Sequence, residues 1–348
     1  MASMNKRRLT RRQAWRVAKI QEERLQRAER KRGHAAEELA ESELGPEQTG
    51  LLVASFGPTV EVEDAHGTAH RCALRQNLGL PVVGDQVVWH AGRSGTGVVT
   101  AITPRRTLLA RPDAAGEARP LAANIDQILV VAAPLPSYDT ALIDPYLVAA
   151  ETTGITPVIV LNKSDLLDAA TRAQMERDFA PYAAIGYRVL HASTVANHGL
   201  DALIEALRGR TSVFVGQSGV GKSSLIKTLL PDAEIRVGAL AETTGLGRHT
   251  TSSARLYHLP NGGAVIDSPG VREFRLWELP RETIAQGFPE FRPLLDHCRF
   301  RDCRHHKEPG CALTNAVEAG TISRERLESY RRIVADVETR RRPEWERG

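Results

Sequence analysis

Between residues 49 and 109, apolar side chains come in short runs that turn-forming residues separate. The runs span residues 50–56, 59–63, 70–74, 86–91 and 97–102, with glycine, proline or aspartate between them. About five short strands in roughly 60 residues favour a small closed barrel of the OB type. Such barrels often bind single-stranded nucleic acid. A purely structural barrel stays open as an alternative, because aromatic residues are few in this stretch.

From residue 125 the pattern changes to longer apolar runs that alternate with helical segments. A nearly continuous apolar run such as residues 125–133 is typical of a strand buried on both faces, as parallel sheets require. We expect further strands at 157–161, 187–192, 211–215 and 264–266, a strand at 254–259 paired with the last of them, and helices at 145–153, 170–179, 199–207 and 225–230. The alternation predicts an α/β domain with a mostly parallel sheet.

The two ends of the chain carry basic groups. Residues 1–32 contain 12 Lys and Arg but 3 Asp and Glu, so this arm has a net charge of +9 within a chain of net charge +4. We expect a mobile tail or a helix formed on RNA, and a solvated charged helix is the alternative. A last helix at 321–338 carries Arg324, Arg326, Arg331 and Arg332, which we expect to face nucleic-acid phosphates.

Composition narrows the class of protein. A hydrophobic content of 42% with 25% charged residues is that of a folded protein, and no apolar run approaches the ~18 residues needed to span a bilayer. The N-terminus lacks the apolar core of a secretory signal. Four cysteines do not make a disulfide framework, so we expect a cytoplasmic protein with no membrane partner.

A phosphate-binding loop follows the run at 211–215. The pattern G-x-x-x-x-G-K-S spans Gly216, Gln217, Ser218, Gly219, Val220, Gly221, Lys222 and Ser223, and Ser224 follows. Its glycines let backbone N–H groups converge on phosphate oxygens, and the next helix adds the positive end of its dipole. We expect Lys222 to reach the β- and γ-phosphates and Ser223 to bind Mg²⁺.

A second motif indicates which base is bound. Asn162, Lys163, Ser164 and Asp165 form the N-K-x-D pattern at the end of a predicted strand. The Asp165 carboxylate can accept hydrogen bonds from guanine N1–H and N2–H₂, whereas adenine would leave it unpaired. Asn162 can tie this loop to the phosphate loop. Ser193 and Thr194, after the next strand, are the expected partners of the guanine loop, and which backbone N–H meets guanine O6 stays open.

The remaining nucleotide contacts are expected beyond the phosphate loop. Asp267, in Asp-Ser-Pro-Gly, fits the role of the acidic residue that holds Mg²⁺ through water. Gly270 fits the role of the glycine whose N–H senses the γ-phosphate. Thr250 and Thr251 are alternative Mg²⁺ ligands in a loop-like stretch at 240–253. Val271 stands where many GTPases carry a water-orienting glutamine, so either another residue orients the water or the ribosome supplies or positions the group that does. His249, in the same loop-like stretch as Thr250 and Thr251, is the candidate catalytic residue, and a solvent-exposed loop histidine is the alternative.

A cluster of metal ligands lies near the C-terminus. Cys298, Cys303, His305 and Cys311 supply three thiolates and one imidazole. This complement suits one tetrahedral, structural Zn²⁺ with no position left for catalysis. His297 and His306 are rival ligands with less suitable spacing. The metal is expected to stabilise a segment too poor in apolar residues to fold alone.

The order of these motifs is unusual, because N-K-x-D precedes the phosphate loop instead of following it. A circularly permuted GTPase domain explains this order. With a leading barrel and a trailing Cys/His cluster, the chain resembles the ribosome small-subunit-dependent GTPase A family from about residue 50 to 340. The resemblance implies a factor acting late in 30S ribosomal subunit assembly that contacts 16S rRNA, with low intrinsic GTP hydrolysis stimulated by that subunit. It also points to His249 and to the same four zinc ligands.

The resulting expectation is a multidomain α/β protein. Its parts are a basic arm at 1–47, an OB-type β-barrel at 48–109, a circularly permuted GTPase domain at 110–278 and an α-helical zinc-binding domain at 279–348. We expect GTP and GDP as ligands, Mg²⁺ with GTP, and a monomer. A non-enzymatic RNA-binding module that binds nucleotide to stay folded, and a permuted GTPase acting on the large subunit, are the alternatives.

Overall fold

The computed structural model describes residues 44–76, 78–92, 95–112, 118–136, 138–196, 199–230, 254–268 and 279–341. The described residues form two compact units, of which the first lies within residues 44–81 and 85–104 and the second within residues 82–84 and 105–341. Among the described residues, no helix combines the length and the apolar character needed to cross a membrane.

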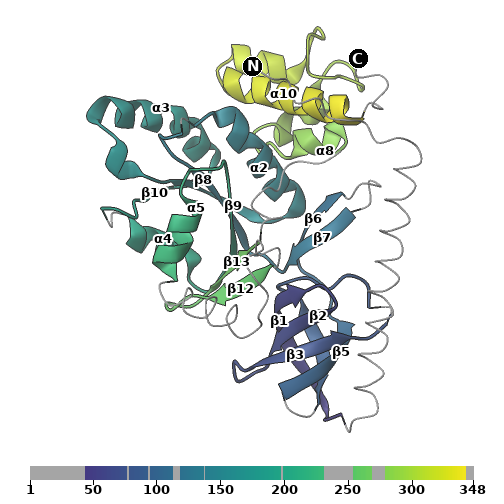
Figure 1. The fold of residues 1–348 in the computed structure, drawn as a ribbon. Coiled ribbons are helices and arrows are strands. Elements are labelled where there is room, and N and C mark those ends of the chain that lie inside the picture. Colours follow the sequence, from purple (N-terminus) through teal and green to yellow (C-terminus); the bar gives the residue numbers. More distant parts are fainter. Residues whose placement is uncertain are drawn as a thin grey trace, which may run out of the picture. The chain divides into compact units, whose positions relative to one another are not determined.

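The first unit is a closed five-stranded barrel (Figure 1). Its strands are β1 (Glu47–Phe56), β2 (Thr59–Glu63), β3 (Ala69–Leu74), β4 (Gln86–Ala91) and β5 (Thr96–Ile102). The order β1-β2-β3-β5-β4 closes because β4 also pairs with β1, and β3 and β5 are the parallel pair. Val60, Val62 and Trp89 are among the side chains that fill the interior. A Cβ at Gly97 would lie 2.8 Å from the Trp89 ring, so the strand needs glycine there.

The second unit contains a six-stranded sheet in the order β10-β9-β8-β11-β13-β12. Five strands are parallel, and β12 pairs antiparallel with β13. The strands are β8 (Gln127–Ala132), β9 (Thr156–Leu161), β10 (Arg188–His191), β11 (Thr211–Val215), β12 (Arg255–His258) and β13 (Ala264–Asp267). A separate hairpin of β6 (Leu108–Pro112) and β7 (Ala118–Ala123) was not expected from the sequence.

Helices cover both faces of this sheet. Leu203 of α4 (Leu200–Leu207) and Leu225 of α5 (Lys222–Leu229) pack with Val131 and Val160 in one buried cluster. Helices α2 (Thr140–Thr153) and α3 (Ala169–Ile185) contact β8, β9 and β10 on the other face (Figure 1). This doubly wound arrangement places the carboxyl ends of the parallel strands at one edge, where ligands bind in such sheets.

Internal prolines account for two of the predicted helix boundaries that were wrong. Helix α2 begins at Thr140, not at Pro145, because the Asp139 side chain caps it by accepting from the Ala141 N–H (2.8 Å). Helix α3 continues past Pro181 to Ile185, and Tyr182 packs in the core with its hydroxyl donating to Asp144 (2.8 Å). In both cases tertiary packing offsets the helix-breaking effect of an internal proline.

The C-terminal part is helical. It comprises α8 (Arg281–Gln286), the 3₁₀ helix η3 (Arg292–His297), α9 (Ala312–Glu318) and α10 (Arg324–Arg341). Phe288, Phe291 and Tyr330 form its aromatic core, in which the two phenylalanine rings stack at 4.7 Å between centroids.

Arg326 joins α10 to the rest of the second unit. Arg326 is 2% exposed, and its guanidinium pairs with Asp144 of α2 and donates to Glu290 (2.7 Å). Arg331 donates to the carbonyl oxygens of His305 (2.9 Å) and His306 (2.7 Å). The predicted contact with nucleic-acid phosphates was therefore wrong for Arg326, which is buried and paired, and it stays a prediction for the other arginines of this helix.

Candidate nucleotide site and metal cluster

The phosphate loop connects β11 to α5, as the sequence predicts. Gly216, Gly219 and Gly221 have φ values of 134°, 84° and 97°, which disfavour side chains. A Cβ at Gly216 would lie 2.3 Å from the Val131 carbonyl oxygen of the neighbouring strand. The Lys222 ammonium donates to the carbonyls of Gly216 (2.7 Å) and Gln217 (2.6 Å), so it lies over the loop that would hold the phosphates.

The guanine loop follows β9 and is tied to the phosphate loop. The Asn162 side-chain amide donates to the Val220 carbonyl (2.9 Å), which confirms the predicted tie. Lys163, at φ 58°, donates from Nζ to the carbonyls of Leu135 (2.6 Å) and Gly219 (2.7 Å). Two motifs 50 residues apart in the chain thus form one site, because β9 and β11 both pair with β8.

Asp165 is held by a residue of the next loop. The buried Ser193 hydroxyl donates to Asp165 Oδ1 (2.5 Å), and its oxygen accepts from the backbone N–H groups of Val195 (3.2 Å) and Ala196 (3.0 Å). These contacts fix the orientation of the carboxylate while Asp165 itself stays exposed. Thr194, beside Ser193, is half-buried. The arrangement suits an acceptor that reads the edge of a base.

Asp267 ends β13 next to the phosphate loop. Strand β13 pairs with β11 in parallel register, with Ile266 opposite Val213. Gly270, His249, Thr250 and Thr251 lie outside the described residues. The structure therefore brings together the phosphate loop, the guanine loop, Ser193 and Asp267, and the predictions for the other four residues stay predictions.

The phosphate loop opens into a cleft of about 1070 Å³. Besides the loop residues Gly216–Gly219 and Gly221–Ser224, its walls include Lys163 and the first turns of α2. Helix α10 contributes Arg332, Ile333, Asp336 and Val337. Sequence reasoning missed α2 and α10 as parts of this site, because neither helix carries a nucleotide-binding motif.

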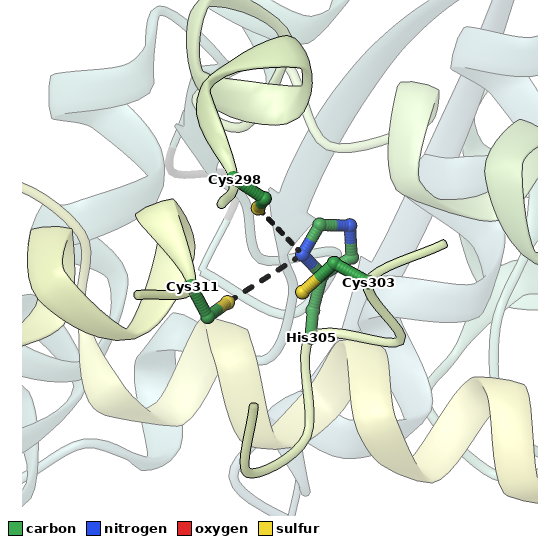
Figure 2. Close-up of side chains that lie close together, drawn as sticks. All are labelled: Cys298, Cys303, His305 and Cys311. Carbon is green, nitrogen blue, oxygen red and sulfur yellow. Dashed lines mark hydrogen bonds between the residues drawn. The ribbon is translucent and has the colours of Figure 1, made fainter. Parts of the chain in front are cut away.

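The predicted metal ligands converge on one point (Figure 2). The thiol sulfurs of Cys298, Cys303 and Cys311 and a ring nitrogen of His305 all lie within 4.8 Å of one another. His305 Nδ1 is 3.5 Å from the Cys298 sulfur and 3.6 Å from the Cys311 sulfur. These separations suit a tetrahedral ion with metal–sulfur bonds of about 2.3 Å. The cluster can hold a metal ion.

The loop around the cluster is shaped by hydrogen bonds. The Ala312 N–H donates to the Cys298 sulfur (3.3 Å), as backbone donors do around metal-bound thiolates. The Glu308 carboxylate accepts from the N–H groups of Arg304, His306 and Lys307 at 2.9–3.0 Å. Burial alone would raise the pKa of Glu308, but these donors outweigh it and lower the pKa to about 2. His297 and His306 are exposed and lie outside the cluster formed by the described residues.

Comparison with known proteins agrees with this architecture. A family model described as RsgA GTPase matches residues 102–277. The chain is 53% identical over 338 residues to the small ribosomal subunit biogenesis GTPase RsgA of Azotobacter vinelandii, covering 96% of this chain and 98% of the relative. The Pseudomonas aeruginosa protein of that name is 53% identical over 334 residues, with coverage of 96% and 98%.

Two solved structures share the fold. YjeQ from Thermotoga maritima superimposes with a TM-score of 0.70 at 32% identity, covering 84% of this chain and 99% of that one. YloQ, described as a circularly permuted GTPase, gives a TM-score of 0.67 at 31% identity, with coverage of 86% and 97%. The predicted barrel and permuted GTPase fold are confirmed. The chain belongs to the RsgA GTPase family.

Proposed function

We propose that this protein is a GTP-hydrolysing factor that acts in late maturation of the 30S ribosomal subunit. The observation that carries the proposal is the joining of the phosphate loop and the guanine loop through the Asn162–Val220 hydrogen bond. The relatives' name, small ribosomal subunit biogenesis GTPase, supports the choice of partner. On this proposal the protein works in the cytoplasm as a monomer and contacts 16S rRNA.

Different residues of the site bind the base and the phosphates of the nucleotide. Asp165, oriented by Ser193, accepts the N–H groups of guanine, while Asn162 holds the two loops together. The backbone N–H groups between Gly216 and Ser224 surround the phosphates, and Lys222 moves from the loop carbonyls to the phosphate oxygens. This exchange costs little, because the ammonium replaces hydrogen bonds to carbonyls with hydrogen bonds to charged oxygens.

Mg²⁺ would be held by Ser223, by Asp267 through water, and by Thr250 or Thr251, and it would neutralise charge that develops on the phosphates. Gly270 would sense the γ-phosphate. His249 would orient the attacking water, because Val271 has no group that can do so. The metal cluster would hold one structural Zn²⁺, because its four ligands leave no open position for a substrate.

GTP hydrolysis by the full chain, measured with and without purified 30S subunits, tests the proposal. We expect slow turnover alone and strong stimulation by 30S. Stimulation by 50S instead would identify a large-subunit factor, and no hydrolysis under any condition would favour a non-enzymatic RNA-binding module. His249→Ala should lower the stimulated kcat and leave nucleotide affinity near that of the wild type. An unchanged stimulated rate would remove His249 from the mechanism.

A further inference from the structure

Helix α10 forms a wall of the cleft above the phosphate loop. The four α10 residues that line the cleft, Arg332, Ile333, Asp336 and Val337, recur at the spacing of one helix face. The loop residues Gly216–Gly219 and Gly221–Ser224 line the same cleft. Asp165 and Ser193, which would read the base, are not among the lining residues. Helix α10 therefore lines the same cleft as the phosphate loop and Lys163, and the described lining does not include Asp165 or Ser193.

Three sets of contacts fix this helix in place. Arg326 is buried between Asp144 of α2 and Glu290, and it lies over the Phe288 ring at 4.5 Å. Arg331 donates to the backbone carbonyls of His305 and His306 in the loop between Cys298 and Cys311, here called the metal loop. Arg281 of α8 pairs with Glu338 near the end of the helix. Because α2 lines the same cleft, the ion pair with Asp144 sets the distance between two of its walls.

The charged side chains that line the cleft differ in whether they already have hydrogen-bond partners. The Lys163 and Lys222 ammonium groups already donate to loop carbonyls, and Asp139 caps α2. Asp336 lies one turn beyond Arg332 on the same wall. The Arg332 side chain is exposed and has no hydrogen-bond or ion-pair partner among the residues that the structure describes. Among the described residues, it is thus a guanidinium in the cleft that no other side chain or carbonyl engages.

A guanidinium presents paired N–H donors that match two oxygens of one phosphate. We propose that Arg332 binds the terminal phosphate of a nucleoside triphosphate held by the phosphate loop, so that α10 distinguishes the triphosphate from the diphosphate. The terminal phosphate is the part of the nucleotide that extends furthest from the base-reading residues, and α10 lines the cleft into which the phosphate loop opens. This inference rests on the proposed guanine-nucleotide function of the same site.

The test compares two nucleotides on the full-length, zinc-loaded chain with Mg²⁺. Equilibrium titrations with a fluorescent non-hydrolysable GTP analogue and with fluorescent GDP give the two dissociation constants. Loss of one charge-assisted contact weakens binding by roughly tenfold to a hundredfold. We expect Arg332→Gln to weaken binding of the GTP analogue by this amount and binding of GDP by less than about twofold. The dissociation constant of Arg332→Lys for the analogue should lie between those of the wild type and Arg332→Gln.

Arg324→Gln, on the exposed first turn of the same helix, is the matched control and should bind both nucleotides as the wild type does. Equal weakening of both nucleotides by Arg332→Gln would overturn the inference, as would unchanged binding of both. Unchanged nucleotide binding with weaker binding to 30S subunits would also overturn it and would assign Arg332 to the ribosome. A wild-type chain that bound no guanine nucleotide would instead refute the proposed function.

Discussion

Replacing Arg326 should loosen α10 from the rest of the second unit. Arg326→Met removes a cation that is 2% exposed and leaves the Asp144 carboxylate, 1% exposed, without its partner. Breaking a buried ion pair from one side costs about 3–5 kcal/mol. Glu290 loses its partner too, and the Phe288 and Tyr182 rings lose the stacked guanidinium. A cost near the upper end of that range is therefore expected.

Hydrogen exchange of the zinc-loaded full chain measures this effect locally. An opening free energy lowered by about 3–5 kcal/mol speeds exchange of α10 amides by roughly a hundredfold to several thousandfold. Peptides from the barrel unit should exchange at the wild-type rate, and Arg324→Met is the control for an exposed arginine. Adding Asp144→Asn and Glu290→Gln to Arg326→Met neutralises the stranded carboxylates and should recover at least half of the loss. Wild-type exchange in Arg326→Met, or no recovery in the triple variant, would refute this account.

Three further changes have defined outcomes. Asp165→Asn should weaken GDP binding by at least about a hundredfold and strengthen xanthosine diphosphate binding, because the new amide can donate to the O2 of xanthine; parallel losses for both nucleotides would contradict the assignment. Metal chelation should expose the three thiols within Cys298–Cys311 to a thiol reagent, whereas Cys72, whose pKa burial raises to about 12, should stay unreactive in the folded barrel. The Asp64 carboxyl should titrate with a pKa of about 2 by NMR, mainly because the His70 ring donates to it, and His70→Ala should raise that value. Since the pKa of Asp64 in the folded chain lies below the ordinary 3.8, this carboxylate stabilises the barrel above about pH 4, and the stabilisation is lost as the pH falls toward 2. An Asp64 titration midpoint at the ordinary value would mean that this carboxylate does not stabilise the barrel.

The sequence predicted the barrel well because its strands are short and each is bounded by turn residues. Strands β2 and β4 begin and end where expected, and β1, β3 and β5 start one to three residues earlier. The parallel strands could be predicted equally well, because burial on both faces requires continuous apolar runs in the sequence. The predicted residues 157–161 and 211–215 match β9 and β11 within one residue.

The errors come from interactions that local sequence does not encode. Proline at position 145 suggested a helix start, yet the Asp139 cap places the start earlier. Arg326 and Arg331 were indistinguishable from surface arginines, and only the packing of α10 shows that one is buried and the other bound to the metal loop. The contribution of α10 to the cleft has no motif to mark it, because it depends on how a helix distant in sequence folds back over α2.

The permuted order explains how the helical region that carries the candidate metal cluster comes to line the candidate nucleotide cleft. In the usual order a guanine-loop strand would follow β13, whereas here the chain after β13 continues into the C-terminal helices. The quantity to compare is the ratio of the affinity for the GTP analogue to the affinity for GDP. If the C-terminal helices influence the nucleotide through Arg332 alone, metal removal and Arg332→Gln should not have additive effects on this ratio. Chelation should lower the ratio in the wild type, because Arg331 holds α10 to the metal loop, and should leave it unchanged in Arg332→Gln. Additive losses would mean that the metal loop reaches the phosphates by a route other than α10.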